Sequence, residues 1–338
     1  MIKINVSQYF VVVILIMNTT LIFAQNHSNI DMKSELIKPP YLQKGDTVMI
    51  IATAGIIQDS TIIESGIKLL NEWGLKVKQS KNLYAPNHHF AGTDKQRLED
   101  FQNAIDDDNI KAVWCARGGY GTVRIIDDIN FNKFKLKPKW VIGFSDVTVL
   151  HNEIHNLGIE TIHALMPSTL KLDNDDQKKA QKSLKKALFG KKLNYKVSES
   201  SYNKEGEAKG QLVGGNLSIL YSLLGSRSSI DTDGKILFIE DVGEYVYHID
   251  RMLMNLKRNG YFEKCAGLIV GGISDIREND VEFGKTIEEV VLDAVKDYHF
   301  PVSFDFPAGH VRDNRTLILG RKISLKVKEN KAVVKFLK

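Results

Sequence analysis

Short apolar runs that alternate with helix-like segments constrain the fold of this chain more than any other feature. In the first half, β-rich apolar runs stand at 47–55, 110–115 and 140–143. Around them, segments with the apolar spacing and the start and stop residues of helices occur at 59–73, 93–106, 122–128 and 146–157. Because such alternation is typical of βαβ units, the first half is predicted to form a parallel sheet.

The second half resumes the alternation after a polar interruption. Strands are predicted at 236–241, 266–272 and 302–310, helices at 217–224, 247–259 and 286–298, and alternating strands over 318–336. The interruption consists of a charged, helix-forming stretch and a polar stretch, and we place the domain linker there, at 171–209. A chain of 338 residues is long enough for two domains, which we expect at 42–170 and 210–338.

The N-terminus has the pattern of a secretory signal peptide. Lys3 precedes an apolar segment, and Ala24 is a small residue at a cleavage point. A membrane-spanning helix is the weaker alternative, because three polar residues interrupt a run already short of the roughly 20 residues that a span needs. No cysteine stands directly after the apolar segment, so a lipid anchor is not expected. We therefore expect a signal peptide at 1–24, an arm at 25–41, and a periplasmic or secreted protein without a stable membrane anchor.

The composition is that of an ordinary globular protein with a small positive net charge. The 46 basic and 41 acidic residues give +5, and uncharged residues interrupt the lysine-rich stretches. This balance lacks the basic footprint of a nucleic-acid-binding protein, so no nucleic-acid partner is expected. The two cysteines, Cys115 and Cys265, stand in apolar stretches. Buried free thiols are favoured, and a disulfide stays open in an oxidising compartment.

The stretch Gly143-Phe144-Ser145-Asp146 turns sharply from an apolar strand into a helix. A serine at such a turn has its hydroxyl lifted out of the sheet, beside the unpaired N–H groups of the helix start, which can bind an oxyanion. The alternative is that Ser145, or Asp146 beside it, only caps the helix. Val147 replaces the final glycine of GxSxG, so the turn should resemble a nucleophile elbow without the α/β-hydrolase fold.

Three polar residues are predicted at the carboxyl ends of apolar strands: Ser145, Glu240 and His310. Parallel α/β sheets place their ligand sites at this edge. A serine, a histidine and a carboxylate suffice for nucleophilic acyl transfer, in which the histidine takes the hydroxyl proton and the carboxylate orients the imidazole. The alternative is coincidence, because polar residues are common at strand ends.

A glycine-rich turn, Arg117-Gly118-Gly119-Tyr120-Gly121, follows the strand at 110–115. Three glycines permit a backbone approach that no side chain would allow. They could cradle a phosphate, supply oxyanion N–H groups beside Ser145, or form a purely structural turn. The pattern is neither GxGxxG nor GxxxxGK[ST], so a nucleotide site has weak support.

Two histidines, His151 and His155, share one face of a predicted helix. A zinc-protease helix requires H-E-x-x-H, whereas here the acid, Glu153, stands at the third position and points elsewhere. We therefore expect no metal, and nothing in the sequence requires a cofactor.

Taken in order, the motifs resemble the L,D-carboxypeptidase family of serine peptidases, also called muramoyltetrapeptide carboxypeptidases. The resemblance covers nearly the whole chain from about Leu42. Each motif is weak alone, but the ordered set is specific. It comprises Lys44-Gly45-Asp46-Thr47, Phe90-Ala91-Gly92-Thr93, Ala116-Arg117-Gly118-Gly119-Tyr120-Gly121, Gly143-Phe144-Ser145-Asp146, Gly214-Gly215-Asn216-Leu217, Ile239-Glu240-Asp241, Ile249-Asp250-Arg251-Met252-Leu253 and Gly309-His310.

The resemblance implies a fold and a set of roles. The fold is α/β, with a Rossmann- or flavodoxin-like N-terminal parallel sheet domain that carries a nucleophile-elbow-like turn, and a smaller C-terminal α/β domain of the swivelling type. The triad would assemble across their interface in a homodimer that needs no metal. The roles are Ser145 as nucleophile, His310 as general base and acid, Glu240 as the residue that orients His310, and the backbone N–H groups of Asp146 and of Gly118 or Gly119 as the oxyanion hole.

The family's usual reaction removes the terminal D-alanine from a murein tetrapeptide. A related branch, the microcin C self-immunity peptidases, cleaves a peptidyl-nucleotide, and a non-catalytic murein-peptide binding protein is a further alternative. The signal peptide departs from the cytoplasmic habit of many members and disfavours the immunity role. Arg117 and Tyr120 are candidate substrate-binding residues, and either Arg117 or Arg124 could pair with the substrate's terminal carboxylate.

Overall fold

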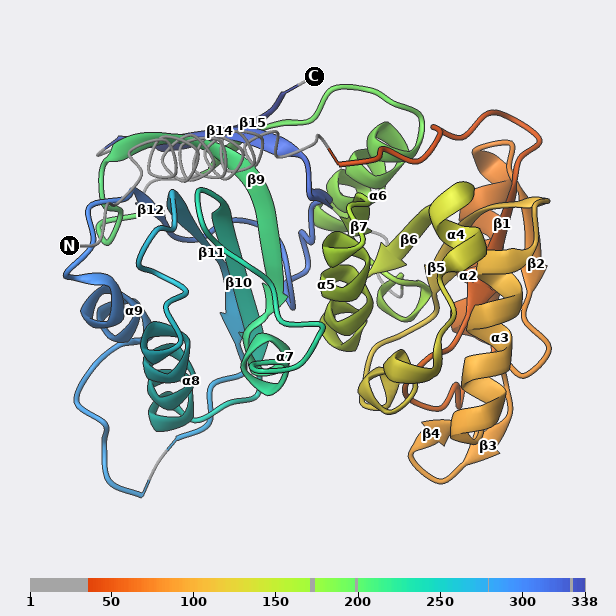
Figure 1. Ribbon diagram of the computed structural model, residues 1–338, viewed down its shortest axis with the longest axis horizontal. Helices are drawn as coiled ribbons and strands as arrows, with labels where there is room; N and C mark the ends of the chain where they lie inside the picture. The colour runs from red at the N-terminus through yellow and green to blue at the C-terminus, as the bar shows by residue number, and fades with distance from the viewer. Residues whose placement is uncertain (1–35, 171–173, 198–199, 279, 329–330, 338) are drawn as a thin grey trace, which may run out of the picture. The chain divides into compact units, whose positions relative to one another are not determined.

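The computed structural model describes residues 36–170, 174–197, 200–278, 280–328 and 331–337. The predicted signal peptide at 1–24, and the arm as far as residue 35, lie outside the described residues. Within the described part the chain forms two large sheets and a two-stranded ribbon, with helices between the strands (Figure 1). No described helix is long and apolar enough to cross a bilayer.

The N-terminal sheet has the order β13-β7-β6-β5-β1-β2. Its first five strands in chain order run parallel, as the alternation predicts: β1 (Thr47–Ile51), β2 (Lys76–Gln79), β5 (Ile110–Cys115), β6 (Trp140–Gly143) and β7 (Thr161–His163). The sixth strand, β13 (Leu317–Leu319), comes from the far end of the chain and pairs antiparallel with β7. The predicted parallel sheet is therefore confirmed, with an antiparallel edge strand that local pattern did not predict.

The helices of this half follow from local signals. They are α2 (Thr61–Glu72), α3 (Asp94–Asp106), α4 (Asn132–Leu136) and α5 (Thr148–Asn156), and a ribbon of β3 (Pro86–Asn87) and β4 (Phe90–Ala91) precedes α3. Thr93 is the N-cap of α3, as predicted, and exchanges hydrogen bonds with Gln96 in a capping box. After α2 the chain turns at Gly74, whose φ of 80° lies in the left-handed region that glycine tolerates.

The C-terminal sheet is mixed, with the order β12-β11-β10-β9-β14-β15-β8. Four neighbours run parallel: β9 (Gly206–Asn216), β10 (Ile236–Val242), β11 (Gly267–Ser274) and β12 (Val302–Ser303). The antiparallel part consists of β14 (Lys322–Lys328), β15 (Lys331–Phe336) and β8 (Asn194–Val197). The long strand β9 joins the two parts, because its first half pairs with β14 and its second half with β10.

Alternation along β10 decides which residues face which side of this sheet. Leu237 and Ile239 pack in one cluster with α7 (Leu217–Ser222), α8 (Val246–Arg258) and α9 (Ile287–Val295). These helices lie beside the sheet in Figure 1. Ile236 and Phe238 join a second cluster that also contains residues of the N-terminal sheet. Glu240 has the same parity as Phe238, so it points toward the N-terminal half.

Several predicted elements differ from those observed. In the segment predicted as linker, 171–209, the charged stretch forms α6 (Asp175–Leu188), as its helix-forming composition predicts. The polar stretch instead forms β8 and the first residues of β9, because these strands pair with β15 and β14. The predicted helix at 122–128 is instead two short 3₁₀ turns. The predicted strand 302–310 ends at Ser303, since Asp305 has a φ of 54° and Pro307 lacks an N–H to donate.

Both cysteines are buried free thiols. Burial raises the pKa of the Cys115 thiol to about 12, so it stays protonated and is a poor nucleophile at neutral pH. The question that the sequence left open is therefore answered in favour of free thiols.

Candidate active site

Ser145 stands at a sharp turn between β6 and α5. Phe144 is still extended, with a φ of −153°, whereas Ser145 has a φ of 64°. A non-glycine residue in the left-handed region is uncommon, and such strain is concentrated at functional sites. Gly143 permits the turn, because a Cβ there would lie 2.8 Å from Val147 Cγ2. The side chain of Ser145 makes no capping hydrogen bond, so the helix-cap alternative is wrong for this serine.

His310 lies between Ser145 and Glu240. Its Nε2 is 3.2 Å from Ser145 Oγ, and its Nδ1 is 2.6 Å from Glu240 Oε2. With the Nδ1 proton donated to the carboxylate, Nε2 is free to accept the serine hydroxyl proton. The three side chains therefore form a continuous hydrogen-bonded chain from residues widely separated in sequence.

The strand-end prediction describes this placement only in part. Ser145 follows the end of β6, but Glu240 is the fifth residue of β10, and His310 lies in a loop well beyond β12. A bridge between Gly272 and Gly309 brings that loop back to the sheet. Gly309 permits the approach, because a Cβ there would lie 2.7 Å from Glu240 Oε2, and its φ is 99°.

The charges of Glu240 and His310 stabilise each other in a buried site. Burial alone would raise the pKa of Glu240, which is fully inaccessible, but the neighbouring His163 and His310 outweigh it and lower the pKa to about 2. Burial alone would lower the pKa of His310, but Glu240 outweighs it and raises that pKa above its usual value. Glu240 is therefore ionised at neutral pH and favours the imidazolium that would form when His310 accepts a proton.

The glycine-rich turn passes directly against the serine. A Cβ on Gly118 would lie 2.9 Å from Ser145 Oγ and 3.5 Å from the backbone N of Asp146, so no larger residue fits there. Gly119 has a φ of 121°, which also favours glycine. The Asp146 carboxylate holds the two segments together, because its Oδ2 accepts the N–H of Thr122 at 2.9 Å. This arrangement places the backbone of Gly118 beside Ser145 Oγ and the backbone N of Asp146.

A cavity of about 370 Å³ opens over these residues. Its lining includes Ser145, His310, Phe144 and the segment Arg117-Gly118-Gly119. Arg117 donates from Nη1 to the carbonyl oxygen of Ile56 at 2.8 Å. Six further lining residues were not predicted from the sequence, namely Gln58, Asp59, Ile62, Met166, Ser168 and Thr169. Gln58 and Asp59 follow the small-residue turn after β1, so the strand-end rule could have found them.

Two residues predicted near the substrate do not line this cavity. The Tyr120 side chain is 47% exposed, with its ring 5.9 Å from that of Phe90. The Arg124 guanidinium is engaged by both carboxylate oxygens of Asp94, at 2.7 to 3.0 Å. Arg117 is therefore the better placed of the two predicted carboxylate partners.

Of the paired histidines of α5, His151 is buried and His155 is partly buried. His151 donates from Nε2 to the carbonyl oxygen of Gly143 at 2.9 Å, and thus supports the strand that leads to Ser145. Burial lowers the pKa of His151 to about 3 and that of His155 to about 4, so both are neutral at neutral pH. In the described part of the chain, no group of three or more His, Cys, Asp or Glu side chains could hold a metal ion.

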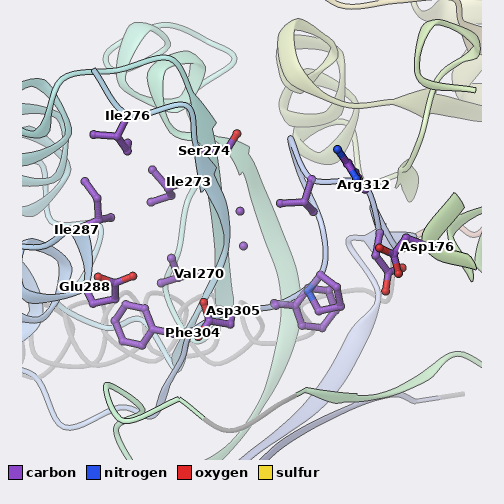
Figure 2. A pocket seen from close by; sticks show the side chains of 16 residues that line it. Asp176, Val270, Ile273, Ser274, Ile276, Ile287, Glu288, Phe304, Asp305 and Arg312 are labelled. Carbon is purple, nitrogen blue, oxygen red and sulfur yellow. The ribbon is translucent and has the colours of Figure 1, made fainter. Parts of the chain in front are cut away.

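A larger cavity, of about 630 Å³, lies on the C-terminal half (Figure 2). Apolar side chains such as Val270, Ile273 and Ile287 line it together with Glu288 and Asp305. Its lining contains no member of the Ser145, His310 and Glu240 chain. Two features link it to that chain: Val311 and Arg312, which follow His310, line the cavity, and Ser274 Oγ donates to the backbone oxygen of His310 at 3.0 Å. This cavity thus contacts the loop that carries His310.

The fold and the enzyme class agree with known proteins. A model of the LD-carboxypeptidase N-terminal domain matches residues 48–164, and a model of the C-terminal domain matches residues 209–325. These matches identify a serine hydrolase with a two-domain α/β fold. The chain belongs to the LD-carboxypeptidase family, peptidase S66.

Individual relatives cover most of the chain. A probable murein peptide carboxypeptidase of Bacillus subtilis is 38% identical over 88% of this chain and 94% of its own length. The murein tetrapeptide carboxypeptidase of Pseudomonas aeruginosa is 28% identical over 81% of this chain and 91% of its own length. The structure of a muramoyltetrapeptide carboxypeptidase from Oxalobacter formigenes superimposes with a TM-score of 0.77 at 27% identity, over 86% of this chain and 99% of that one.

Proposed function

We propose that this protein is a serine-type L,D-carboxypeptidase that removes the terminal D-alanine from murein tetrapeptides. One observation carries the proposal, namely the hydrogen-bonded chain from Ser145 through His310 to Glu240 at a cavity. The relatives named for murein peptides support the substrate class, because they cover most of the chain.

The mechanism follows from these positions. Ser145 Oγ attacks the scissile carbonyl carbon while His310 Nε2 takes the hydroxyl proton. The N–H of Asp146 and one from Gly118 or Gly119 hold the oxyanion. His310 then protonates the amine of the departing D-alanine, and an acyl ester remains on the serine. Water, activated by His310, hydrolyses this ester and restores the hydroxyl.

Arg117 is the proposed partner of the substrate's terminal carboxylate. A carboxypeptidase must recognise a free carboxylate next to the bond that it cuts, and a guanidinium can bind one through two parallel hydrogen bonds. Arg117 lines the cavity beside Ser145, and its Nη1 donates a hydrogen bond to the carbonyl oxygen of Ile56, which orients the side chain. Arg124, in contrast, is already paired with Asp94.

The decisive test replaces the nucleophile. The variant Ser145→Ala should lose measurable release of D-alanine from a murein tetrapeptide, because the acyl-enzyme cannot form. Ser65→Ala is a matched control, since Ser65 is an exposed serine on α2 whose Oγ donates to the carbonyl of Thr61, and it should keep wild-type activity. Undiminished release by Ser145→Ala would refute the proposal.

A second candidate is cleavage of a peptidyl-nucleotide. The microcin C7 self-immunity protein MccF of Escherichia coli is 26% identical over 77% of this chain and 84% of its own length. Side-by-side assays of a murein tetrapeptide and an aminoacyl-nucleotide analogue separate the two functions, because each predicts its own preferred substrate. Affinity for the tetrapeptide without turnover would instead support a non-catalytic binding protein.

Compartment and assembly are further proposals. The basic residue, apolar run and small residue at 1–24 support export with cleavage after Ala24, and the N-terminal sequence of the mature protein tests it. A homodimer is proposed from the family resemblance alone. Light scattering of the purified protein gives the mass that decides between one copy and two.

A further inference from the structure

The carboxylate of Glu240 has two oxygens, and the chain to Ser145 uses only one of them. Oε2 accepts the hydrogen bond from His310, whereas Oε1 is buried and has no hydrogen-bond partner among the described residues. Buried carboxylate oxygens are normally paired, because desolvation without a donor is costly. The side chain that faces Oε1 is His163, whose Nε2 lies 3.9 Å away.

His163 is buried at the end of a central strand and has no other polar partner among the described residues. It is the last residue of β7, in register with Gly143 of β6 and opposite Leu317 of β13. Its side chain is fully buried, and neither ring nitrogen has a hydrogen-bond partner among the described residues. Its ring packs against the rings of Phe144, at 5.7 Å, and Phe238, at 5.1 Å.

The other titratable groups near His163 have partners of their own. His151, with its ring centre 6.3 Å away, donates its Nε2 proton to the carbonyl of Gly143. His310 lies beyond Glu240 and engages the opposite oxygen. Asp241, the next residue along β10, accepts hydrogen bonds from Asn216 and Ser218. The unpaired nitrogen of His163 and the unpaired oxygen of Glu240 therefore face each other.

We propose that His163 is a positioning residue that donates its Nε2–H to Glu240 Oε1, so that the carboxylate is clamped between two histidines. The present separation exceeds a hydrogen bond by less than about 1 Å, which a small rotation of either side chain would close. This inference rests on the proposed function of Ser145, His310 and Glu240.

A second donor would have two effects on the site. It would fix the plane of the carboxylate, so that Oε2 stays aimed at Nδ1 of His310. It would also stabilise the ionised carboxylate, and so lower the affinity of the Glu240–His310 pair for a proton. Loss of this donor should therefore raise the pKa of the Glu240–His310 pair and move the acid limb of the pH profile to higher pH.

The experiment compares kcat, KM and the pH profile of D-alanine release for the wild type, His163→Phe and His163→Gln. The apolar His163→Phe should lower kcat about 10- to 100-fold, as loss of an outer partner of a functional group does, and leave KM nearly unchanged. Its acid limb should lie at higher pH. His163→Gln, which keeps an N–H donor, should recover most of kcat and the wild-type limb.

Two further variants separate positioning from folding. His151→Phe is a matched control, because His151 is equally buried and its ring centre lies 6.3 Å from that of His163, but its Nε2 donates to Gly143 and not to Glu240. The acid limb of this variant should not move. If thermal unfolding shows that His163→Phe does not fold, the smaller His163→Leu takes its place. The inference would be overturned if the acid limb of His163→Phe stayed at the wild-type pH, or if His163→Gln lost as much kcat as His163→Phe.

Labelling by a fluorophosphonate probe keeps this test separate from the proposed substrate. Such a probe reports activation of Ser145 whatever the enzyme cleaves. A wild type that is labelled at Ser145 but releases no D-alanine overturns the murein proposal alone. In that case, slower labelling of His163→Phe than of His163→Gln supports the clamp, and equal labelling rates refute it.

Discussion

At the scale of the residue, the site depends on two glycines whose backbone passes close to the side chains of Ser145 and Glu240. Gly118 and Gly309 each occupy a position where a Cβ would meet Ser145 Oγ or Glu240 Oε2 at less than 3 Å. Glycine is therefore required by the geometry of the site and not merely by a loop. The charge of Glu240 depends on its neighbours, because burial raises the pKa of this carboxyl and His163 and His310 lower it.

Replacement of Glu240 by glutamine tests this electrostatic role. The shape of the side chain is kept, but His310 loses the charge that raises its pKa. We expect kcat to fall by on the order of 10³-fold or more, as for a triad whose acid becomes an amide. The acid limb should move to lower pH, opposite to His163→Phe, since burial then dominates the pKa of His310. Steady-state kinetics measure the fall in kcat, and the pH dependence of kcat/KM measures the shift of the acid limb. An acid limb that stays at the wild-type pH would contradict this account.

At the scale of the element, a buried cation links α3 to the glycine-rich turn. Arg97 of α3 is fully buried, and it donates to the carbonyl of Gly92, to Asp94 Oδ1 and to the carbonyl of Gly121. Its guanidinium also lies 4.7 Å from the centre of the Phe90 ring. The segment that approaches Ser145 is thus anchored from one side by Arg97 and from the other by the Asp146–Thr122 hydrogen bond.

Arg97→Met should destabilise the protein, because the carbonyls of Gly92 and Gly121 would be left without this donor. We expect the free energy of unfolding to fall by about 2 kcal/mol, as for buried acceptors left without a donor. Chemical denaturation measures this change. Lys95→Met on the exposed face of the same helix is the control and should be close to neutral. Equal stability of the two variants would show that Arg97 is not an anchor.

At the scale of the whole molecule, the two halves share one structural unit. The C-terminal half returns β13 to the N-terminal sheet, and one apolar cluster contains Trp114 and Ile162 together with Phe238 and Ile269. The Glu240–His310–Ser145 chain crosses the same boundary. Loss of the tertiary structure should therefore disrupt the core and the site together.

Stability of the whole molecule should decline in acid because two histidines of α5 have lowered pKa values. The pKa of His151 is lowered from its usual 6.5 to about 3, and that of His155 to about 4, by burial. Between pH 6.5 and these pKa values, the two histidines bind protons in the unfolded chain but not in the native state. Their contribution to the free energy of unfolding is therefore fully present above pH 6.5 and is lost as the pH decreases. Each such histidine costs at most about 1.4 kcal/mol per pH unit.

Urea denaturation from neutral pH down to pH 4 measures this slope. His151→Gln should flatten it, because the amide can still donate to the carbonyl of Gly143 but does not titrate. His88→Gln is the control, since His88 lies in a surface turn, and it should leave the slope as in the wild type. Parallel slopes for all three proteins would contradict the assignment of acid sensitivity to His151.

The candidate site was predictable where its residues carry a local signal. Ser145 follows an apolar strand at a turn, and the glycines at 118 and 119 mark a close backbone approach. His163 carries no such signal, because a histidine at the end of a short strand differs in no local respect from an ordinary core residue. Arg124 and Tyr120 stand beside the glycine-rich turn in sequence, but the structure directs them to Asp94 and Phe90 instead.

The sequence by itself determined the parallel strands of the first half, the capped helix α3, the sharp turn at Ser145 and the polar residues available for chemistry. These depend on periodicity, capping and backbone sterics, which act over a few residues. Only the tertiary structure decided that β13 closes the N-terminal sheet, that the predicted linker forms strands, and that Glu240 lies between His310 and His163. Such pairings depend on packing between distant segments, and no local pattern encodes which surfaces meet.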